Sequence, residues 1–231
     1  MEFQVGDVVT HHEMCGVERR MLQHGMNFRS GRNRSVILMS RRPGAPYDDQ
    51  VFDEGRTLIY EGHNIPRQRG GPEPYSVDQP RTTRSGRLTP NGKFEAAALA
   101  FKAGEQVAEL VRVYEKIKDG IWVFNGVFRL VDACEQVSGN RKVFKFKLEL
   151  TAEGVPSVAD AANLEHTRLI PPSIKQQVFK RDRGKCVLCG SKDNLHFDHE
   201  LPYSKGGTSI KAENIRLLCA RHNLAKGAKI E

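Results

Sequence analysis

Two short pairs of metal-binding residue types near the C-terminus constrain this chain more than any other feature. Cys186-Val-Leu-Cys189 places two thiols across a tight turn, and Cys219-Ala-Arg-His222 adds a third thiol and an imidazole at the same spacing. Together they predict a tetrahedral zinc site, and four protein ligands make that zinc structural because no position is left for water. The alternative is a group of buried thiols without a metal. About sixty residues bury too little apolar surface to be stable alone, so we expect the zinc to hold a small domain together.

The charge of the chain indicates a phosphate-rich partner. The net charge is +8, and residues 171–231 carry 12 Lys and Arg against 6 Asp and Glu. A basic surface of this kind favours nucleic acid. Arg29, Arg32 and Arg34 lie in a further stretch, residues 19–42, without an acidic residue, although ordinary solvated charge is the alternative there.

The remaining composition favours a cytoplasmic protein without a membrane segment. No apolar run approaches the roughly 18 residues that a membrane span needs, and the first residues lack the order of a signal peptide. Five cysteines in a reducing compartment are not expected to form disulfides. Cys15 and Cys134 have no partners of the zinc-binding kind and are expected in the core.

The pattern of apolar runs predicts an α+β protein with two domains. Short runs rich in β-branched and aromatic residues alternate with Gly, Pro and Asn, which predicts strands of a curved or barrel-like sheet. The expected strands are residues 5–10, 35–39, 57–60, 107–114, 121–131 and 143–150. A helix is expected over 93–104, after a long polar loop that is expected to be functional. A change of composition after Thr151 and the pair Pro171-Pro172 predict a first domain over 1–152, a linker over 153–172 and a second domain over 173–231, whose first helix opens with a capping box of Ser173 and Gln176.

The segment between the zinc ligands resembles the HNH, or ββα-metal, nuclease family. Residues 195–199 and 213–218 are expected as strands and 219–228 as a helix, which makes a ββα unit. The resemblance covers about residues 173–229 and rests, besides the zinc ligands, on Asp198-His199, Pro202, Gly206-Gly207, Asn214, Leu218-Cys219, His222-Asn223 and Lys226. It implies a zinc-stabilised ββα-metal domain that hydrolyses phosphodiesters.

The same resemblance implies roles for four residues of the nuclease site. His199 would be the general base that deprotonates the attacking water. Asp198 and Asn223 would hold one catalytic divalent cation, Mg²⁺ or Mn²⁺, through oxygen ligands. Asn214 would set the loop that orients the base. Asn223 stands where some members of the family have a last His, and His222 is expected to bind zinc because of its spacing from Cys219.

The N-terminal domain resembles the SRA (YDG) domain family, which implies an SRA/PUA-like curved β-barrel. The match rests on an apolar strand followed by Tyr47, Asp48, Asp49 and Gly55, and on Tyr60-Glu61-Gly62 in the next strand; the namesake Tyr-Asp-Gly is here Phe124-Asn125-Gly126. SRA domains flip a modified cytosine out of the duplex, and an extruded base must recover its unstacking cost in a snug pocket. Tyr47 and Tyr60 would stack on the base, and Asp48 or Asp49 would accept from its exocyclic amine. The alternatives are a turn residue for Tyr47 and a core residue for Tyr60.

Together these patterns predict a modification-dependent DNA endonuclease that acts on duplex DNA carrying 5-methylcytosine or 5-hydroxymethylcytosine. Arg29, Arg32, Arg34 and Arg84 would contact DNA phosphates. An HNH site cuts one strand, so a homodimer is expected for double-strand breaks. One alternative is an HNH endonuclease that reads phosphorothioate, N6-methyladenine or no modification. The other is a zinc-containing DNA-binding protein without catalysis.

Overall fold

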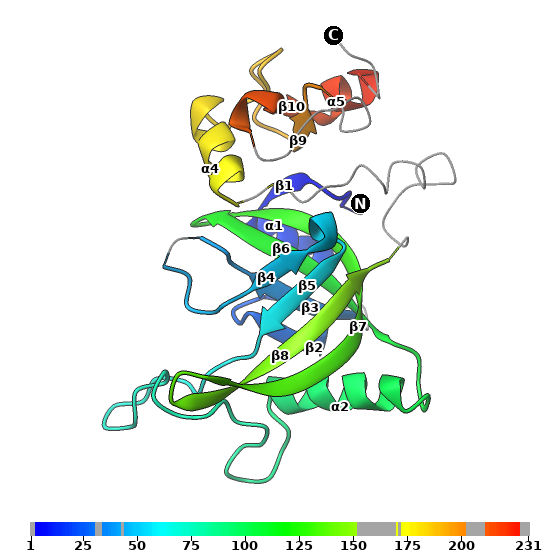
Figure 1. The fold of residues 1–231 in the computed structure, drawn as a ribbon. Helices are drawn as coiled ribbons and strands as arrows, with labels where there is room; N and C mark the ends of the chain where they lie inside the picture. Colours follow the sequence, from blue (N-terminus) through cyan, green and yellow to red (C-terminus); the bar gives the residue numbers. More distant parts are fainter. Residues whose placement is uncertain are drawn as a thin grey trace.

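The computed structural model describes residues 3–30, 34–42, 44–151, 170, 172–201 and 211–226, and it has the expected α+β class (Figure 1). We call residues 3–151 the N-terminal part and residues 170–226 the C-terminal part, each without its undescribed residues. The elements in chain order are β1 (Asp7–Thr10), α1 (His11–Glu18), β2 (Met26–Ser30), β3 (Arg34–Met39), β4 (Gln50–Phe52), η1 (Asp53–Gly55), β5 (Thr57–Glu61), α2 (Pro90–Lys102), β6 (Glu109–Lys118), β7 (Ile121–Ser138), β8 (Arg141–Leu150), α4 (Pro172–Arg181), β9 (Leu195–His199), η3 (Ala212–Asn214), β10 (Ile215–Cys219) and α5 (Ala220–Lys226).

One curved sheet runs through both parts of the molecule. Its strand order is β10-β9-β1-β7-β6-β3-β2, while β8 pairs with β7 and β5, and β5 pairs with β4. Strand β7 is 18 residues long, and it pairs with β1 and β6 near its start but with β8 along its second half. The sheet therefore bends around β7, as Figure 1 shows. The tight turn from β6 to β7 contains Gly120 at φ +78°, where a Cβ would be strained.

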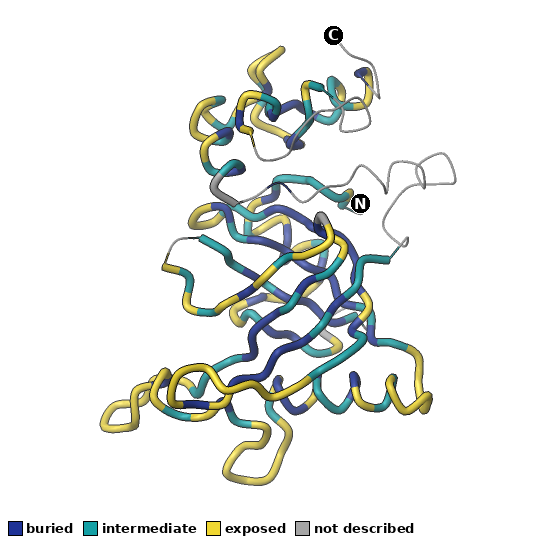
Figure 2. Tube along the Cα trace, in the orientation of Figure 1, coloured by how far each residue is buried: buried dark blue, intermediate teal, exposed yellow. Residues whose placement is uncertain are grey.

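Helix α2 covers the open side of the curved sheet in the N-terminal part. Thr89 caps its first turn, and Pro90 stands at the first helical position, which suits its fixed φ. Phe94 is fully buried and packs its ring against Phe28 and Phe146, with centroids 5.4 Å and 5.8 Å away. The central strands that this helix covers are buried along most of their length (Figure 2).

The C-terminal part extends the same sheet and shares a core with the N-terminal part. Strand β9 pairs antiparallel with β1, in the register Asp7 with His196 and Val8 with Leu195. The side chains of the first pair also come close, since His196 Nδ1 lies 2.9 Å from Asp7 Oδ1. One apolar cluster contains residues of both parts: Ile117, Val123, Ile170, Val178, Cys186, Leu195, Phe197, Ala212, Ile215, Leu217, Leu218 and Cys219. The C-terminal part is therefore packed against the N-terminal part rather than tethered beside it.

Several sequence predictions differ from the structure or fall outside it. Helix α1 and strands β2 and β4 were not expected, although Thr10 and Glu13 form a capping box at the start of α1. Almost all residues of the predicted linker lie outside the residues that the structure describes, and the side chain of Ser173 is not described either. Gln176 donates to the carbonyl of Ile117 at 3.0 Å. Among the described residues, no helix has the length and apolar character to cross a bilayer.

Candidate functional site

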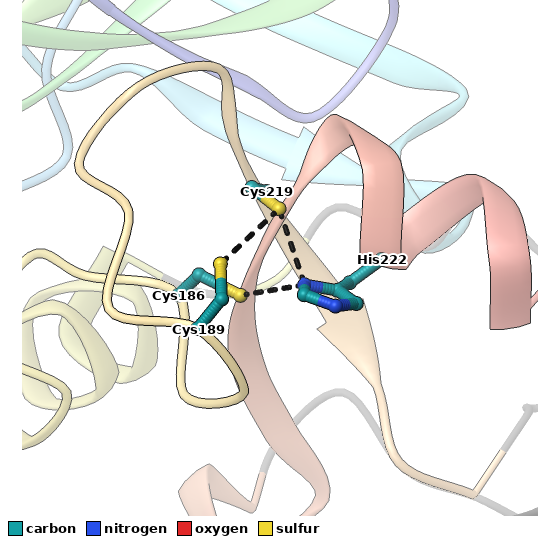
Figure 3. A group of neighbouring side chains, drawn as sticks. All are labelled: Cys186, Cys189, Cys219 and His222. Carbon is teal, nitrogen blue, oxygen red and sulfur yellow. Dashed lines mark hydrogen bonds between the residues drawn. The ribbon is translucent and has the colours of Figure 1, made fainter.

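The four predicted zinc ligands converge on one point. Their donor atoms all lie within 4.8 Å of one another, and Figure 3 shows the side chains turned toward a common centre. Cys189 Sγ lies 3.7 Å from Cys219 Sγ, and His222 Nδ1 lies 3.4 Å and 3.3 Å from the Sγ atoms of Cys186 and Cys219. A tetrahedron with zinc–sulfur bonds of about 2.3 Å has edges of about 3.8 Å, so these distances fit a zinc ion. The cluster could bind zinc, as the spacing of the ligands predicted.

The backbone around the first two thiols prepares this geometry. The amide of Cys186 donates to Ser191 and its carbonyl accepts from Gly190, at 2.8 Å each, and Gly190 has φ +73°. The amide of Val187 donates to Leu217 at 3.0 Å, which ties the turn to β10. Burial opposes ionisation of the Cys186 thiol, but backbone amides and the ring of His222 outweigh burial and lower its pKa to about 6. A thiolate is the form that binds metal.

Asp198 and His199 lie at the end of β9, where the basic residues of β10 and α5 meet them. Lys226 Nζ lies 2.5 Å from Asp198 Oδ2 and also donates to the carbonyl of His199, while Arg216 Nε lies 3.5 Å from the same carboxylate oxygen. Lys226 is only 3% exposed. Asn223 precedes Lys226 by about one helical turn, so both belong to the face of α5 that meets β9. The carboxylate oxygens of Asp198 and the amide oxygen of Asn223 are the type of ligand that a hard divalent cation prefers.

Asn214 holds the chain directly after the predicted general base. Its side-chain oxygen accepts from the amide of Leu201 at 2.8 Å, and its side-chain nitrogen donates to the carbonyl of Leu201 at 3.1 Å. Its own carbonyl accepts from the amide of Glu200 at 2.8 Å. This geometry suits a residue that orients the loop after His199. The catalytic role itself stays a prediction.

A cavity of about 450 Å³ opens on the N-terminal part, in the size range of ligand pockets. It lies between the segment after β3, strand β5 and the turn between β7 and β8. Its lining residues are Arg41, Arg42, Gly44, Ala45, Pro46, Tyr47, Asp48, Asp49, Glu61, Ser138 and Arg141. Three of the four residues predicted for the base pocket, Tyr47, Asp48 and Asp49, therefore line one cavity.

Tyr60 does not line this cavity, in contrast to the prediction for a two-tyrosine stack. It is 2% exposed and belongs to the main apolar cluster, as in the alternative interpretation. The ring of Tyr47 instead stacks on His63, with centroids 5.2 Å apart and an angle of 11°. The hydroxyl of Tyr60 lies 3.0 Å from His63 Nε2. Burial, with a smaller effect of His24, lowers the pKa of His63 to about 4, so the ring is neutral at physiological pH.

The carboxylates around the cavity have unequal surroundings. Asp49 accepts from the backbone amides of Ser40 and Glu61, at 3.2 Å and 3.1 Å, and burial raises its pKa to about 7. Asp48 is mostly exposed and lies 3.1 Å from Lys145 Nζ. Glu61 is buried and binds both Lys145 and Arg141, at 3.1 Å and 3.3 Å. Asp49 thus serves the backbone, while Asp48 is the carboxylate most open to a ligand.

The predicted DNA-binding arginines are spread over the N-terminal part. Arg29 is half exposed and bonds Glu109 at 2.9 Å, and Arg84 is exposed in the loop before α2. Arg34 begins β3, and Arg32 lies outside the described residues. No described contact brings these arginines together into one surface.

The sequence placed Arg41 and Arg42 in a basic stretch but did not assign them, Glu61 or Arg141 to the cavity, nor His63 to the stack with Tyr47. Period-two alternation could have found Glu61, since neighbours in a strand face opposite sides and Tyr60 faces the core. Gly62 was part of the quoted pattern, and the structure explains it: a Cβ there would lie 2.7 Å from the side-chain oxygens of Asn91 and Gln79. Arg41 and Arg42 belong to the basic stretch over residues 19–42, whereas Arg141 carries no comparable local signal.

Comparison with known protein families identifies the C-terminal segment. Residues 186–229 match the family model described as HNH endonuclease. This segment is an HNH endonuclease domain. Nucleases of this family use a divalent metal to hydrolyse phosphodiesters, so the chain is a DNA-hydrolysing enzyme, as predicted. No curated protein sequence matches the chain.

Solved structures similar to the chain include SRA domains and a restriction endonuclease. The SUVH5 SRA domain in complex with hemi-methylated CG DNA is 24% identical to this chain and has a TM-score of 0.44. The match covers 66% of this chain and 91% of the SUVH5 chain. The same domain bound to fully hydroxymethylated CG DNA is 23% identical, with coverages of 66% and 87% and a TM-score of 0.40. The type IV phosphorothioation-dependent restriction endonuclease ScoMcrA is 15% identical, with coverages of 99% and 57% and a TM-score of 0.43. SRA domains are thus among the solved structures that the chain resembles.

Proposed function

We propose that the protein is a modification-dependent DNA endonuclease whose N-terminal part reads modified cytosine and whose C-terminal part cuts the DNA. The observation that supports this best is the position of a ligand-sized cavity with an aromatic ring and carboxylates on the same sheet as the HNH segment. We propose domains over residues 1–152 and 173–231 with a linker over 153–172. The substrate is duplex DNA with 5-methylcytosine or 5-hydroxymethylcytosine.

In the reading step, the cavity receives a cytosine that leaves the base stack. Tyr47 offers its ring for stacking, and the neutral ring of His63 behind it supports Tyr47 at an angle of 11°. Asp48, or Asp49 after a shift of its backbone contacts, accepts from the exocyclic amine. Arg29, Arg32, Arg34 and Arg84 contact phosphates on either side of the flipped nucleotide.

In the cutting step, His199 accepts a proton from the water that attacks phosphorus. Asp198 and Asn223 hold a divalent cation, Mg²⁺ or Mn²⁺, which supplies charge neutralisation at the phosphate when bound. Asn214 holds the loop at Leu201, so that the imidazole keeps its direction. The products carry a 5′-phosphate and a 3′-hydroxyl. Cys186, Cys189, Cys219 and His222 hold a structural zinc, and two copies of the chain act on opposite strands.

Digestion of matched duplexes tests the proposed reading function. One sequence is prepared with 5-methylcytosine, 5-hydroxymethylcytosine, phosphorothioate, N6-methyladenine or no modification, and each duplex is incubated with Mg²⁺ or Mn²⁺. Cleavage of the two modified-cytosine duplexes at rates at least about tenfold above the unmodified one is expected, since a missed base contact costs about 1–3 kcal/mol. Equal cutting of all duplexes contradicts the reading function, and preference for another modification changes the ligand.

The variant His199→Ala tests the cutting function. It is expected to bind the modified duplex as tightly as the natural protein and to lose cleavage by about 10² to 10⁴ because the general base is absent. His196→Ala is a matched control, since that imidazole lies on the same strand but contacts Asp7. Normal cleavage by His199→Ala contradicts the assigned role.

A further inference from the structure

A buried carboxylate joins the cavity of the N-terminal part to the first helix of the C-terminal part. Glu115 on β6 is fully buried, and its Oε1 atom lies 2.9 Å from Arg41 Nε, a residue that lines the cavity. Its Oε2 atom lies 2.7 Å from Nζ of Lys175, a buried residue of α4. One side chain therefore holds a group from each part of the molecule.

The local fold is built to serve this carboxylate. Val113 pairs with Gly126 and Tyr114 with Phe124, so Asn125 is the extra residue of a bulge in β7. A bulge re-aims the side chain it carries. Asn125 donates to Glu115 Oε2 at 3.2 Å and accepts from Lys175 at 3.3 Å. The side-chain amide of Asn125 thus forms a hydrogen bond to each partner of the ion pair between Glu115 and Lys175.

The charges of this cluster do not cancel. Burial alone would raise the pKa of Glu115, but Lys175 and Arg41 outweigh burial and lower it to about 2, so the group is an anion. Arg41 and Lys175 carry two positive charges against this one negative charge. In addition, Nη2 of Arg41 is buried and has no hydrogen-bond partner among the residues that the structure describes. A buried donor without an acceptor is costly, so this guanidinium group favours a further anionic acceptor.

The rim of the cavity favours a phosphodiester as that anion. Arg42 also lines it, which adds a second guanidinium group to that of Arg41, whereas the buried guanidinium of Arg141 is paired with Glu61 at 3.3 Å. Guanidinium groups match phosphate oxygens in geometry and charge. The carboxylates of Asp48 and Glu61, which also line the cavity, disfavour a small anion that enters deeply. A phosphate attached to a base that fills the cavity stays at the rim and meets the arginines.

We propose that Arg41 binds a DNA phosphate beside the nucleotide that enters the cavity, and that Glu115 couples this contact to helix α4. The inference rests on the proposed function, since DNA is the ligand. A bound phosphate neutralises the excess positive charge, which strengthens the hold of Glu115 on Lys175. Because coupling between two sites is reciprocal, firm docking of α4 also favours DNA binding at Arg41.

Helix α4 is tied to the nuclease strands, so the effect can reach them. Arg181 at its end donates to the carbonyls of Ala212 and Ile215, at 2.8 Å and 2.7 Å. The next residue, Asp182, accepts from the amide of Leu217 on β10 at 2.9 Å. Strand β10 leads into the zinc ligand Cys219 and helix α5. Glu115 and Lys175 are thus positioning residues between the cavity and the nuclease site.

The phosphate contact is tested by the salt dependence of DNA binding without added divalent cation. Loss of one phosphate contact lowers the slope of log affinity against log salt by about one. Arg41→Gln is expected to show this loss and to bind roughly tenfold more weakly at moderate salt, because a charged hydrogen bond is removed. Arg129→Gln is the control, since Arg129 is half exposed and pairs with Glu149 on the sheet surface. An unchanged slope for Arg41→Gln overturns the contact.

The coupling is tested by amide hydrogen exchange of α4 with and without the modified duplex. In the natural protein, DNA is expected to slow exchange in α4 severalfold. Arg41→Gln leaves Lys175 and α4 intact but is expected to abolish this slowing at saturating DNA. Lys175→Met is expected to keep the salt slope and lose the slowing. DNA-dependent protection that persists in Arg41→Gln overturns the coupling.

The two proposals fail separately. If modified and unmodified duplexes bind and react equally, the reading function is wrong. The salt dependence of binding to the unmodified duplex then still tests the phosphate contact at Arg41. If modified DNA is preferred but the slope is unaffected, the reading function stands and the role of Arg41 falls.

Discussion

The N-terminal and C-terminal parts are stabilised in different ways. The main core of the N-terminal part contains fifteen buried residues, among them Phe94, Phe144 and Phe146, and all of them belong to that part. The core around the zinc site contains twelve, and two of these, Ile117 and Val123, come from the N-terminal part. Small units bury too little apolar surface to be stable alone. The comparison indicates an N-terminal part that folds by burial of its own core, and we expect the C-terminal part to need both a metal and its neighbour.

Removal of a zinc ligand is the strongest test of this comparison. Cys219→Ser is expected to abolish cleavage and to unfold the C-terminal part. The reason is that structural zinc contributes about 10–16 kcal/mol of apparent binding free energy in small domains. The N-terminal part should keep its own unfolding transition. Zinc content, thermal unfolding and limited proteolysis measure the three effects.

Cys134→Ser is the matched control for the zinc ligand. Cys134 is an exposed thiol on β7 in the N-terminal part, so the prediction of a core position was wrong for this residue. Its substitution should leave zinc content and cleavage unchanged. If Cys219→Ser keeps a full zinc complement and a protected C-terminal part, the metal is not what stabilises it.

A core substitution in the N-terminal part is expected to act without the metal. Phe94→Ala removes a fully buried ring between Phe28 and Phe146 and should lower the free energy of unfolding by about 3–5 kcal/mol. Leu99→Ala on the same helix, at a 45% exposed position, should cost far less. Denaturant unfolding with and without zinc measures both, and a zinc-dependent loss in Phe94→Ala would remove the distinction between the parts.

The pH dependence of stability tests the joint between the parts. The pKa of Glu115 lies at about 2 in the folded chain against an ordinary value of 4.5, so its stabilising effect is present above the ordinary pKa and is lost as the pH falls from there toward 2. The difference in unfolding free energy between the natural protein and Glu115→Gln should therefore be large near neutral pH and shrink below about pH 4.5. A difference that does not change with pH means that the ion pairs add nothing. Glu149→Gln, at a partly exposed surface pair, is the control and should change the free energy of unfolding little.

The smallest effect is expected at an exposed arginine of the loop before α2. Arg84→Gln should leave stability unchanged within about 0.5 kcal/mol, as is usual for surface positions. If Arg84 contacts one phosphate, the salt slope of DNA binding falls by about one. An unchanged slope removes Arg84 from the DNA surface without affecting either core.

The difference between the parts also decided what the sequence could predict. The zinc ligands, Asp198, His199 and Asn214 lie within one short segment, and their spacing follows from tight turns and two short strands. Local geometry therefore predicted their arrangement. Pairing of β9 with β1 joins residues almost two hundred positions apart, and no local pattern specifies it.

The cavity was predicted only in part because it forms from segments that are distant in the chain. Alternation along β5 places Tyr60 and Glu61 on opposite faces, but both residues are buried, and the prediction assigned Tyr60 rather than Glu61 to the cavity. Arg41 and Arg141 come from different ends of the N-terminal part and meet only through the curvature of the sheet. Helix α1 was missed because its eight residues form barely two turns, although its capping box was readable.

The central claim is that reader and nuclease form one rigid unit, joined by the β1–β9 pairing, the shared core and Glu115. Mapping the cut positions on long duplexes with a single modified cytosine tests this most directly. A rigid unit predicts cuts that gather at one distance from the modification, within about one helical turn of roughly ten base pairs. Cuts scattered evenly over several turns on either side would contradict the claim, because only a nuclease that moves freely relative to its reader could place them there.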